Sequence, residues 1–218
     1  TEFTLKEINK EKLYNFLRDM EFNRLLSSVI SAYGDINFNS AKKNFDKVNK
    51  DEKISNKNYQ LIDNDEQVDI WLKEAEKNGE IAIDTETSSL DPHQAKLIGI
   101  SFSTKIGKAC YIPINHTTGK NIDEKLIINK IKPILEDKSI KKIGQNIKFD
   151  FIVLFHRGIN MCSMEDTMLM SYVLDAGKNR HNMDTLAEIH LNHKTISFKE
   201  TVGIGKKQIN FSDVKIDR

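Results

Sequence analysis

Two acidic residues directly follow an apolar run in the middle of the chain. Ile81, Ala82 and Ile83 precede Asp84 and Glu86, and a β-branched run without helical period predicts a buried strand. Residues two apart on a strand point to the same face, so the two carboxylates are expected to lie together. A pair of carboxylates at the end of a buried strand is costly unless a cation lies between them, and a hard divalent cation prefers oxygen ligands. The alternative is a strand end whose acids meet solvent.

A second polar group follows another short predicted strand. Asn146 and Asp150 are four residues apart at the start of a predicted helix, and residues at this spacing share one helix face. The buried stripe of this helix is predicted to be Ile147, Phe151 and Leu154. An amide and a carboxylate at the start of a helix that follows a strand stand where α/β folds bind ligands. The alternative is a helix capped by Asn146, with Asp150 exposed.

The elements that position these residues alternate between strand and helix. Strands are predicted over 59–62, 97–103, 109–114 and 142–144, and helices over 68–78 and 126–135. The hairpin around 104–108 gives the sheet an antiparallel part, so we expect an α/β domain with a mixed sheet. The second helix tolerates Pro133 only with a kink or near its end.

Two further helices are predicted to begin at acidic residues. Asp166 and Asp184 are interpreted as caps. The residues of these helices that we expect to face inward are Leu169, Tyr172, Val173, Leu186 and Ala187. Histidines 181, 190 and 193 lack the spacing of a zinc helix and are assigned to the surface or to hydrogen bonds.

Composition bounds the class of protein. The chain has 218 residues, 39% of them apolar, which is enough for a real core. Its 33 Lys and Arg against 32 Asp and Glu neither favour nor exclude a nucleic-acid partner. No apolar run approaches the ~20 residues of a membrane helix and no signal pattern is present, so we expect a cytoplasmic protein without a membrane partner. Cys110 and Cys162 are expected to be buried free thiols.

Three regions are predicted. Residues 1–34 form a helical appendage, because apolar residues recur at three and four positions over 10–32. Residues 35–57, rich in Asn, Lys, Asp and Ser, are expected to be a linker. Residues 58–218 are expected to form the α/β domain that carries both polar groups. The appendage is interpreted as a local packing element, with partner binding as the alternative.

Both polar groups resemble known nuclease motifs. Residues 83–87, Ile-Asp-Thr-Glu-Thr, and 144–150, Gly-Gln-Asn-Ile-Lys-Phe-Asp, resemble the first two motifs of the 3′-5′ (proofreading) exonuclease domain of the bacterial DNA polymerase I family. The likeness continues, in the same order, through residues 166–169, 172–174, 180–188 and 193–198. Residues 8–30 are similar to the helical stretch that precedes that domain in the family.

The resemblance implies a ribonuclease-H-like fold and stepwise hydrolysis of a DNA strand from its 3′ end to nucleoside monophosphates. Two Mg²⁺ or Mn²⁺ ions, roughly 3.5–4 Å apart, serve such chemistry. By position, Asp84 would bridge both ions, Glu86 would hold the ion that activates water, and Asp150 would hold the other. The implied partners are a single-stranded DNA 3′ end and the remainder of the DNA polymerase I chain.

The resemblance also implies contacts with DNA. Gln145 and Asn146 would touch sugar or phosphate, and Leu90 and Phe198 would touch the terminal bases. Core packing is the alternative for Leu90 and Phe198. Phe149 stands where the family often has a tyrosine and loses one hydroxyl hydrogen bond.

One family motif does not occur in these residues. The third motif, a tyrosine followed four residues later by an aspartate, is expected beyond Arg218, on a helix that Ser212 would cap. Asp213 and Asp217 are four apart but lack the tyrosine. We therefore expect weak or no activity from this chain alone and at most one firmly bound ion.

Two other functions share some of these features. A DNA-binding or scaffolding module with a vestigial nuclease is disfavoured because Asp84, Glu86 and Asp150 are all present. An RNA exonuclease of the ribonuclease D type shares the chemistry and is disfavoured by the polymerase-like segments after Asp166.

Overall fold

The computed structural model describes residues 7–34 and 58–216. They fall into two compact units. The predicted linker, 35–57, lies outside the described residues, as do Asp217 and Arg218. In the described ranges, no helix combines the length and the apolar character needed to cross a bilayer.

The first unit is a pair of helices, α1 (Lys10–Asp19) and α2 (Asn23–Tyr33). The side chain of Asn9 accepts a hydrogen bond from the Lys12 backbone N–H and so caps α1. Tyr14 is buried, and its hydroxyl donates to the carbonyl of Gly34 at the end of α2. The prediction of amphipathic helices over 10–32 is confirmed.

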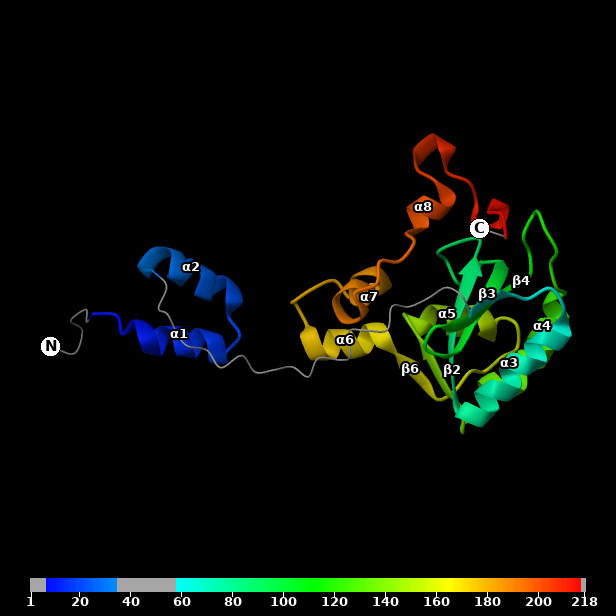
Figure 1. Ribbon diagram of the computed structural model, residues 1–218, viewed down its shortest axis with the longest axis horizontal. Coiled ribbons are helices and arrows are strands. Elements are labelled where there is room, and N and C mark those ends of the chain that lie inside the picture. Colours follow the sequence, from blue (N-terminus) through cyan, green and yellow to red (C-terminus); the bar gives the residue numbers. More distant parts are fainter. Residues whose placement is uncertain (1–6, 35–57, 217–218) are drawn as a thin grey trace. The chain divides into compact units, whose positions relative to one another are not determined.

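The second unit is built on a six-stranded mixed sheet (Figure 1). Its strands are β1 (Asn58–Leu61), β2 (Glu80–Thr87), β3 (Leu97–Lys105), β4 (Lys108–Pro113), β5 (Lys141–Gly144) and β6 (Met164–Asp166). The spatial order is β1-β4-β3-β2-β5-β6. The pairs β2/β3 and β3/β4 are antiparallel and the other three are parallel. The predicted mixed sheet and hairpin are therefore confirmed.

Helices flank this sheet. They are α3 (Asp65–Asn78), α4 (Glu124–Glu136), α5 (Ile147–Phe155), α6 (Thr167–Asp175), α7 (Met183–Leu191) and α8 (Phe198–Val202), followed by the short 3-10 turns η1 (Gly205–Lys207) and η2 (Phe211–Asp213). Helices α3 and α4 lie side by side (Figure 1), joined by ion pairs from Lys130 to Asp65 and Asp69. Pro133 lies in the last turn of α4, the near-terminal position that is predicted for it.

Burial alternates along β2. Ile81, Ile83 and Thr85 are buried, whereas Asp84 and Glu86 are only partly buried. Since neighbours on a strand point to opposite faces, one face of β2 belongs to the core and the other presents the two acids. The core that covers the first face includes Trp71, Phe102, Ile112 and Leu135.

The prediction for α6 was wrong. Leu169, Tyr172 and Val173 are all exposed, Val173 to 80%, and the buried residue of this helix is Ser171. Figure 1 shows α6 and α7 beyond β6, at the edge of the sheet. Helical spacing identifies an apolar face but not what covers it, and in the described residues little of α6 is covered.

The two predicted caps differ. Asp166 is the N-cap of α6, and its carboxylate accepts from the backbone N–H groups of Met168 and Leu169, which confirms the prediction. Asp184 does not cap α7, because Asn182 holds the N-cap position and Asp184 lies in the first turn. Its carboxylate instead accepts a hydrogen bond from the Thr195 hydroxyl. The inward prediction holds for Ala187, which is buried, and in part for Leu186.

Three smaller predictions also need correction or confirmation. Cys110 and Cys162 are both free, but only Cys110 is buried; the Cys162 thiol is partly exposed and donates to the Glu136 carbonyl. Ser212 lies inside η2 and caps no α-helix among the described residues; its carbonyl accepts from the backbone N–H of Thr117. His181 is a hydrogen-bonding residue, as expected, with Ser171 as its partner.

Candidate active site

Strand β2 presents the first two candidate acids. Asp84 pairs with Ser101 of β3 and Glu86 pairs with Gly99. Paired residues of antiparallel strands share a face, so both carboxylates lie on the same face as the small residues Ser101 and Gly99. The predicted shared face of Asp84 and Glu86 is confirmed by the alternating burial of β2.

Helix α5 begins immediately after β5 because Gly144 permits a close approach. A Cβ atom at Gly144 would lie 2.8 Å from Cγ1 of Ile147, so a larger residue would push the first turn of α5 away from the sheet. Asn146 then turns the chain with a left-handed φ of 59°, a conformation that asparagine adopts more readily than most residues. Its side chain does not cap α5, so that alternative reading of Asn146 was wrong.

The cap of α5 comes from a distant residue. The two carboxylate oxygens of Asp166 accept from the backbone N–H groups of Asn146 at 3.0 Å and Ile147 at 3.1 Å. The same side chain caps α6, so it fixes both helices to the end of β6. A carboxylate at a helix N-terminus is also favoured by the helix dipole. Asp166 therefore sets the position of the helix that carries Asp150.

Asp150 reaches the sheet at the point where β5 ends. Strand β5 pairs with β2 only as far as Ala82 and Ile143. Beyond that pair, Oδ1 of Asp150 accepts from the Thr85 backbone N–H at 2.8 Å and from the Thr85 hydroxyl at 2.6 Å. Asp150 is only 2% exposed, so the alternative of an exposed residue was wrong. These bonds hold the carboxylate of Asp150 at Thr85, the residue between Asp84 and Glu86.

The three acids repel one another. Burial raises the pKa of Glu86 to about 7, with further contributions from the negative charges of Asp84 and Asp150. Burial likewise raises the pKa of Asp150 to about 7, helped by Asp84 and opposed by the Thr85 hydrogen bonds. Burial also raises the pKa of Asp84. None of the ion pairs formed in the described ranges involves these acids.

The donor set fits a divalent cation. Three carboxylates without a positive neighbour offer hard oxygen ligands and a surplus of negative charge. In the residues that the structure describes, no group of three or more His, Cys, Asp or Glu side chains is already gathered as a metal site. Binding a cation would therefore have to draw the carboxylates closer together.

Two candidate DNA contacts lie on the surface. Leu90, in the loop after β2, is 96% exposed, and Phe198, at the start of α8, is 58% exposed. Core packing is therefore excluded for both. The ring of Phe198 stacks on that of Phe211, with centroids 6.4 Å apart, so one face of Phe198 is supported by the protein.

The other candidate contacts are used by the fold. The Gln145 amide donates to the His181 carbonyl at 2.7 Å and accepts from the Thr167 hydroxyl at 2.5 Å. Phe149 is partly buried against the core. Their contacts with DNA stay predictions, as does that of Asn146.

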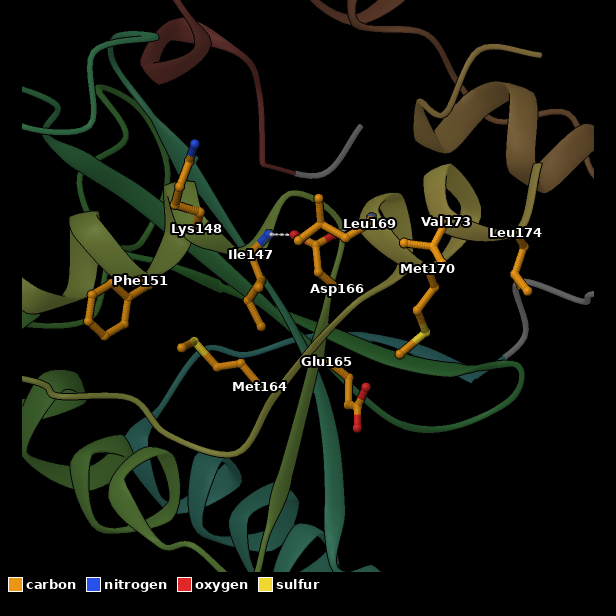
Figure 2. Close-up of a pocket in the computed structure, with 10 residues that line it drawn as sticks. All are labelled: Ile147, Lys148, Phe151, Met164, Glu165, Asp166, Leu169, Met170, Val173 and Leu174. Carbon is orange, nitrogen blue, oxygen red and sulfur yellow. Dashed lines mark hydrogen bonds between the residues drawn. The ribbon is translucent and has the colours of Figure 1, made fainter. Parts of the chain in front are cut away.

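An apolar cavity lies apart from the acids. It measures about 700 Å³ and opens between α5, β6 and α6 (Figure 2). Figure 2 shows Met164, Leu169 and Met170 around it, together with the bond between Asp166 and the Ile147 backbone. Asp84, Glu86 and Asp150 do not line this cavity, so it is separate from the candidate site.

Sequence reasoning missed two groups at the site. Thr85 orients Asp150, and its position between two acids on a strand gave a usable signal, because alternation turns it toward the opposite face. Tyr111 lies near Glu86, and His116 is bonded to Tyr111, although they are 25 and 30 residues away from Glu86 in the chain. Only the register of β3 and β4 brings them there.

Known proteins are similar to this chain in sequence and in fold. Residues 59–215 match the 3′-5′ exonuclease family. The chain is similar to DNA polymerase I of Pseudomonas aeruginosa, with 34% identity over 222 residues that cover 97% of this chain and 23% of that protein. It is also similar to DNA polymerase I of Rhizobium leguminosarum, with 40% identity over 172 residues, 69% of this chain and 17% of that protein.

Solved structures agree on the fold. Escherichia coli RNase D superposes with a TM-score of 0.50 at 19% identity, over 63% of this chain and 34% of that one. The EXO domain of Aedes aegypti Nibbler superposes with a TM-score of 0.53 at 13% identity, over 71% of this chain and 80% of that one. The second unit therefore has the ribonuclease-H-like exonuclease fold.

The chain spans 23% and 17% of the length of the two polymerase relatives. The family match nevertheless covers most of the chain and includes β2, α5 and the acids that they carry. By this match, the chain belongs to the 3′-5′ exonuclease family.

Proposed function

We propose that this chain is the proofreading exonuclease part of a DNA polymerase I and removes nucleoside monophosphates from the 3′ end of a single DNA strand. The observation that carries the proposal is the placement of Asp84 and Glu86 on one face of β2 with Asp150 bonded to Thr85 between them. Burial and the neighbouring negative charges raise the pKa of Glu86, and a divalent cation would compensate these charges. The family match and the polymerase relatives support the choice of DNA as the substrate.

Asp84, Glu86 and Asp150 would hold Mg²⁺ or Mn²⁺, as one ion or two. A bound ion of this kind activates a water and stabilises the leaving oxygen of a phosphodiester. The chain's own residues prepare that site. Thr85 fixes Asp150 by two hydrogen bonds, so its carboxylate is preorganised. Asp84 and Glu86 are held by the strand that presents them.

Exposed apolar side chains would hold the DNA end. Leu90 and Phe198 offer surfaces for unpaired bases, and stacking of this kind tolerates any sequence. Phe198 is supported from behind by Phe211, which reduces its freedom before a base arrives. The site as a whole therefore suits the frayed end of a strand rather than an intact duplex.

The test is hydrolysis of a 5′-labelled single-stranded oligonucleotide with Mn²⁺, at protein excess so that slow hydrolysis is measurable. The unmodified chain should shorten the strand stepwise from its 3′ end, at the low rate expected without the third motif. Asp84→Asn should slow this by at least about 10²-fold, because it removes a charged contact from the reacting site. Asp91→Asn, an exposed acid in the loop after β2, is the matched control and should keep the rate. Equal rates for the unmodified chain and Asp84→Asn, or cleavage from the 5′ end, would overturn the proposal.

A further inference from the structure

The phenol of Tyr111 fills the space beside Glu86. Gly99 pairs with Glu86 across β2 and β3. A Cβ atom at Gly99 would lie only 2.0 Å from the Tyr111 hydroxyl oxygen and 2.3 Å from its Cζ atom. The end of the tyrosine thus occupies the place that a side chain at position 99 would take. Directly paired Cβ atoms are about 4.5–5.5 Å apart, so the hydroxyl lies next to the base of the Glu86 side chain.

A hydrogen-bond chain fixes this phenol. The Tyr111 hydroxyl lies 2.7 Å from Nε2 of His116, and Nδ1 of His116 lies 3.2 Å from the Val214 carbonyl oxygen. His116 is buried, which favours its neutral form. Since a carbonyl only accepts, Nδ1 carries the proton, and Nε2 accepts the proton of the Tyr111 hydroxyl. The direction of the hydroxyl is therefore set.

The hydrogen-bond chain ends at Val214, in a segment that is distant in the sequence. The Thr117 backbone N–H donates to the Ser212 carbonyl at 2.9 Å, and the Thr117 hydroxyl donates to Asp213 at 3.0 Å. The ring of His116 also contacts Phe211, at a centroid distance of 6.0 Å. Residues 211–214 are thus bound to the loop after β4 by backbone, side-chain and ring contacts. The same segment supports Phe198 through Phe211.

We infer that Tyr111 is a positioning residue for Glu86, held by His116 and, through His116, by the segment 211–214. The phenol closes the space over Gly99, so the Glu86 side chain is directed toward Asp84 and Asp150 and not back across β3. The role of Tyr111 in catalysis rests on the proposed function. The effect of Tyr111 on the conformation of Glu86 does not rest on it, so these two roles can be tested separately.

The first measurement is of the side-chain conformation of Glu86 in the metal-free protein. Three-bond NMR couplings between its α and β protons report this conformation. In the unmodified chain these should show one dominant χ1 rotamer. In Tyr111→Ala they should be averaged over rotamers, because the space over Gly99 is open. Tyr59→Ala, a half-exposed tyrosine on β1 of the same sheet, is the matched control and should leave Glu86 unchanged.

The second measurement is of the affinity of each variant for Mn²⁺, by calorimetry. Tyr111→Phe and His116→Leu each remove the same hydrogen bond, so each should weaken binding roughly three- to tenfold. The double variant should be no weaker than either single one, since the two residues act as one unit. A purely structural role would lower the unfolding temperature but leave both the Glu86 couplings and the Mn²⁺ affinity unchanged.

The outcomes separate the two proposals. Averaged Glu86 couplings in the unmodified chain, or unaltered couplings in Tyr111→Ala, would overturn the role of Tyr111. If Tyr111→Ala does not fold, the couplings of Tyr111→Phe and His116→Leu decide the same question, because both remove the hydrogen bond that fixes the ring at position 111. Absence of Mn²⁺ binding by the unmodified chain would overturn the proposed function, and the couplings would still decide the role of Tyr111.

Discussion

At the scale of single residues, the site is governed by charge that the fold does not neutralise. Asp150 is anchored by Thr85, and Glu86 lies close enough to Asp84 and Asp150 for their charges to raise its pKa. A fold that keeps three such acids together without a positive partner loses stability when they ionise. A divalent cation would return that stability, since it binds the folded form.

The pH dependence of stability follows from the raised pKa values of Glu86 and Asp150. Both rise to about 7 from ordinary values of 4.5 and 3.8. Between these values the folded state binds more protons than the unfolded state, so stability without metal should fall as pH rises toward 7. Glu86→Gln should therefore be more stable than the unmodified chain at pH 8, and the difference should shrink at pH 5.

Urea unfolding in the presence of a chelator, at pH 5 to 8, measures this effect. Glu80→Gln, at the exposed start of β2, is the matched control and should follow the unmodified chain. A Glu86→Gln protein that is less stable than the unmodified chain at pH 8 would show that Glu86 is not repelled by its neighbours.

At the scale of elements, Asp166 connects the helix of the site to the sheet. Its carboxylate accepts from four backbone N–H groups, those of Asn146, Ile147, Met168 and Leu169. Most N-caps serve one helix, whereas this one serves α5 and α6. Because α5 carries Asp150, loss of the Asp166 carboxylate should change the position of Asp150 at the site as well as lower the free energy of unfolding.

Asp166→Ala should lower the free energy of unfolding by roughly 2–3 kcal/mol, since it removes the caps of two helices. The matched control is Asp123→Ala, which removes the cap of α4 alone and should cost about 1 kcal/mol. Denaturant unfolding gives both values. Equal losses in the two variants would mean that the bonds of Asp166 to α5 contribute nothing.

Local sequence patterns predicted the elements well. They could not predict the features that depend on contacts between residues distant in the sequence. Alternation and helical period located β2, the β3–β4 hairpin and α5, and placed Asp84 and Glu86 on one face. They could not show that α6 lies at an edge, so its apolar residues were wrongly placed inside. Nor could they show that Thr195 binds Asp184, or that Tyr111 reaches Glu86, because both depend on tertiary register.

At the scale of the whole molecule, the candidate contacts for DNA come from separate segments. Leu90 follows β2, Phe198 begins α8, and the acids lie on β2 and α5. Leu90 and Phe198 are exposed apolar residues, which can stack only on unpaired bases. The chain spans about a fifth of the length of its polymerase relatives.

A short single-stranded oligonucleotide should bind more tightly than a duplex of equal length, with moderate weakening by salt. Phe198→Ala should reduce the affinity by roughly fivefold or more, the loss of one stacked base. Phe155→Ala, an exposed aromatic at the end of α5, is the matched control. Fluorescence anisotropy measures these affinities, and an unchanged affinity in Phe198→Ala would remove Phe198 from the proposed contact.

The most direct test of the central claim is a Mn²⁺ titration followed by electron paramagnetic resonance. Asp84, Glu86 and Asp150 are proposed to hold the ion together, so the unmodified chain should bind Mn²⁺, and binding should strengthen from pH 6 to pH 8 as protons leave Glu86 and Asp150. Asp84→Asn should weaken binding at least tenfold, roughly the value of one charged contact, and Asp91→Asn should not. Binding that is equally strong in the unmodified chain and in Asp84→Asn, or that is independent of pH, would contradict the claim that these carboxylates form the metal site.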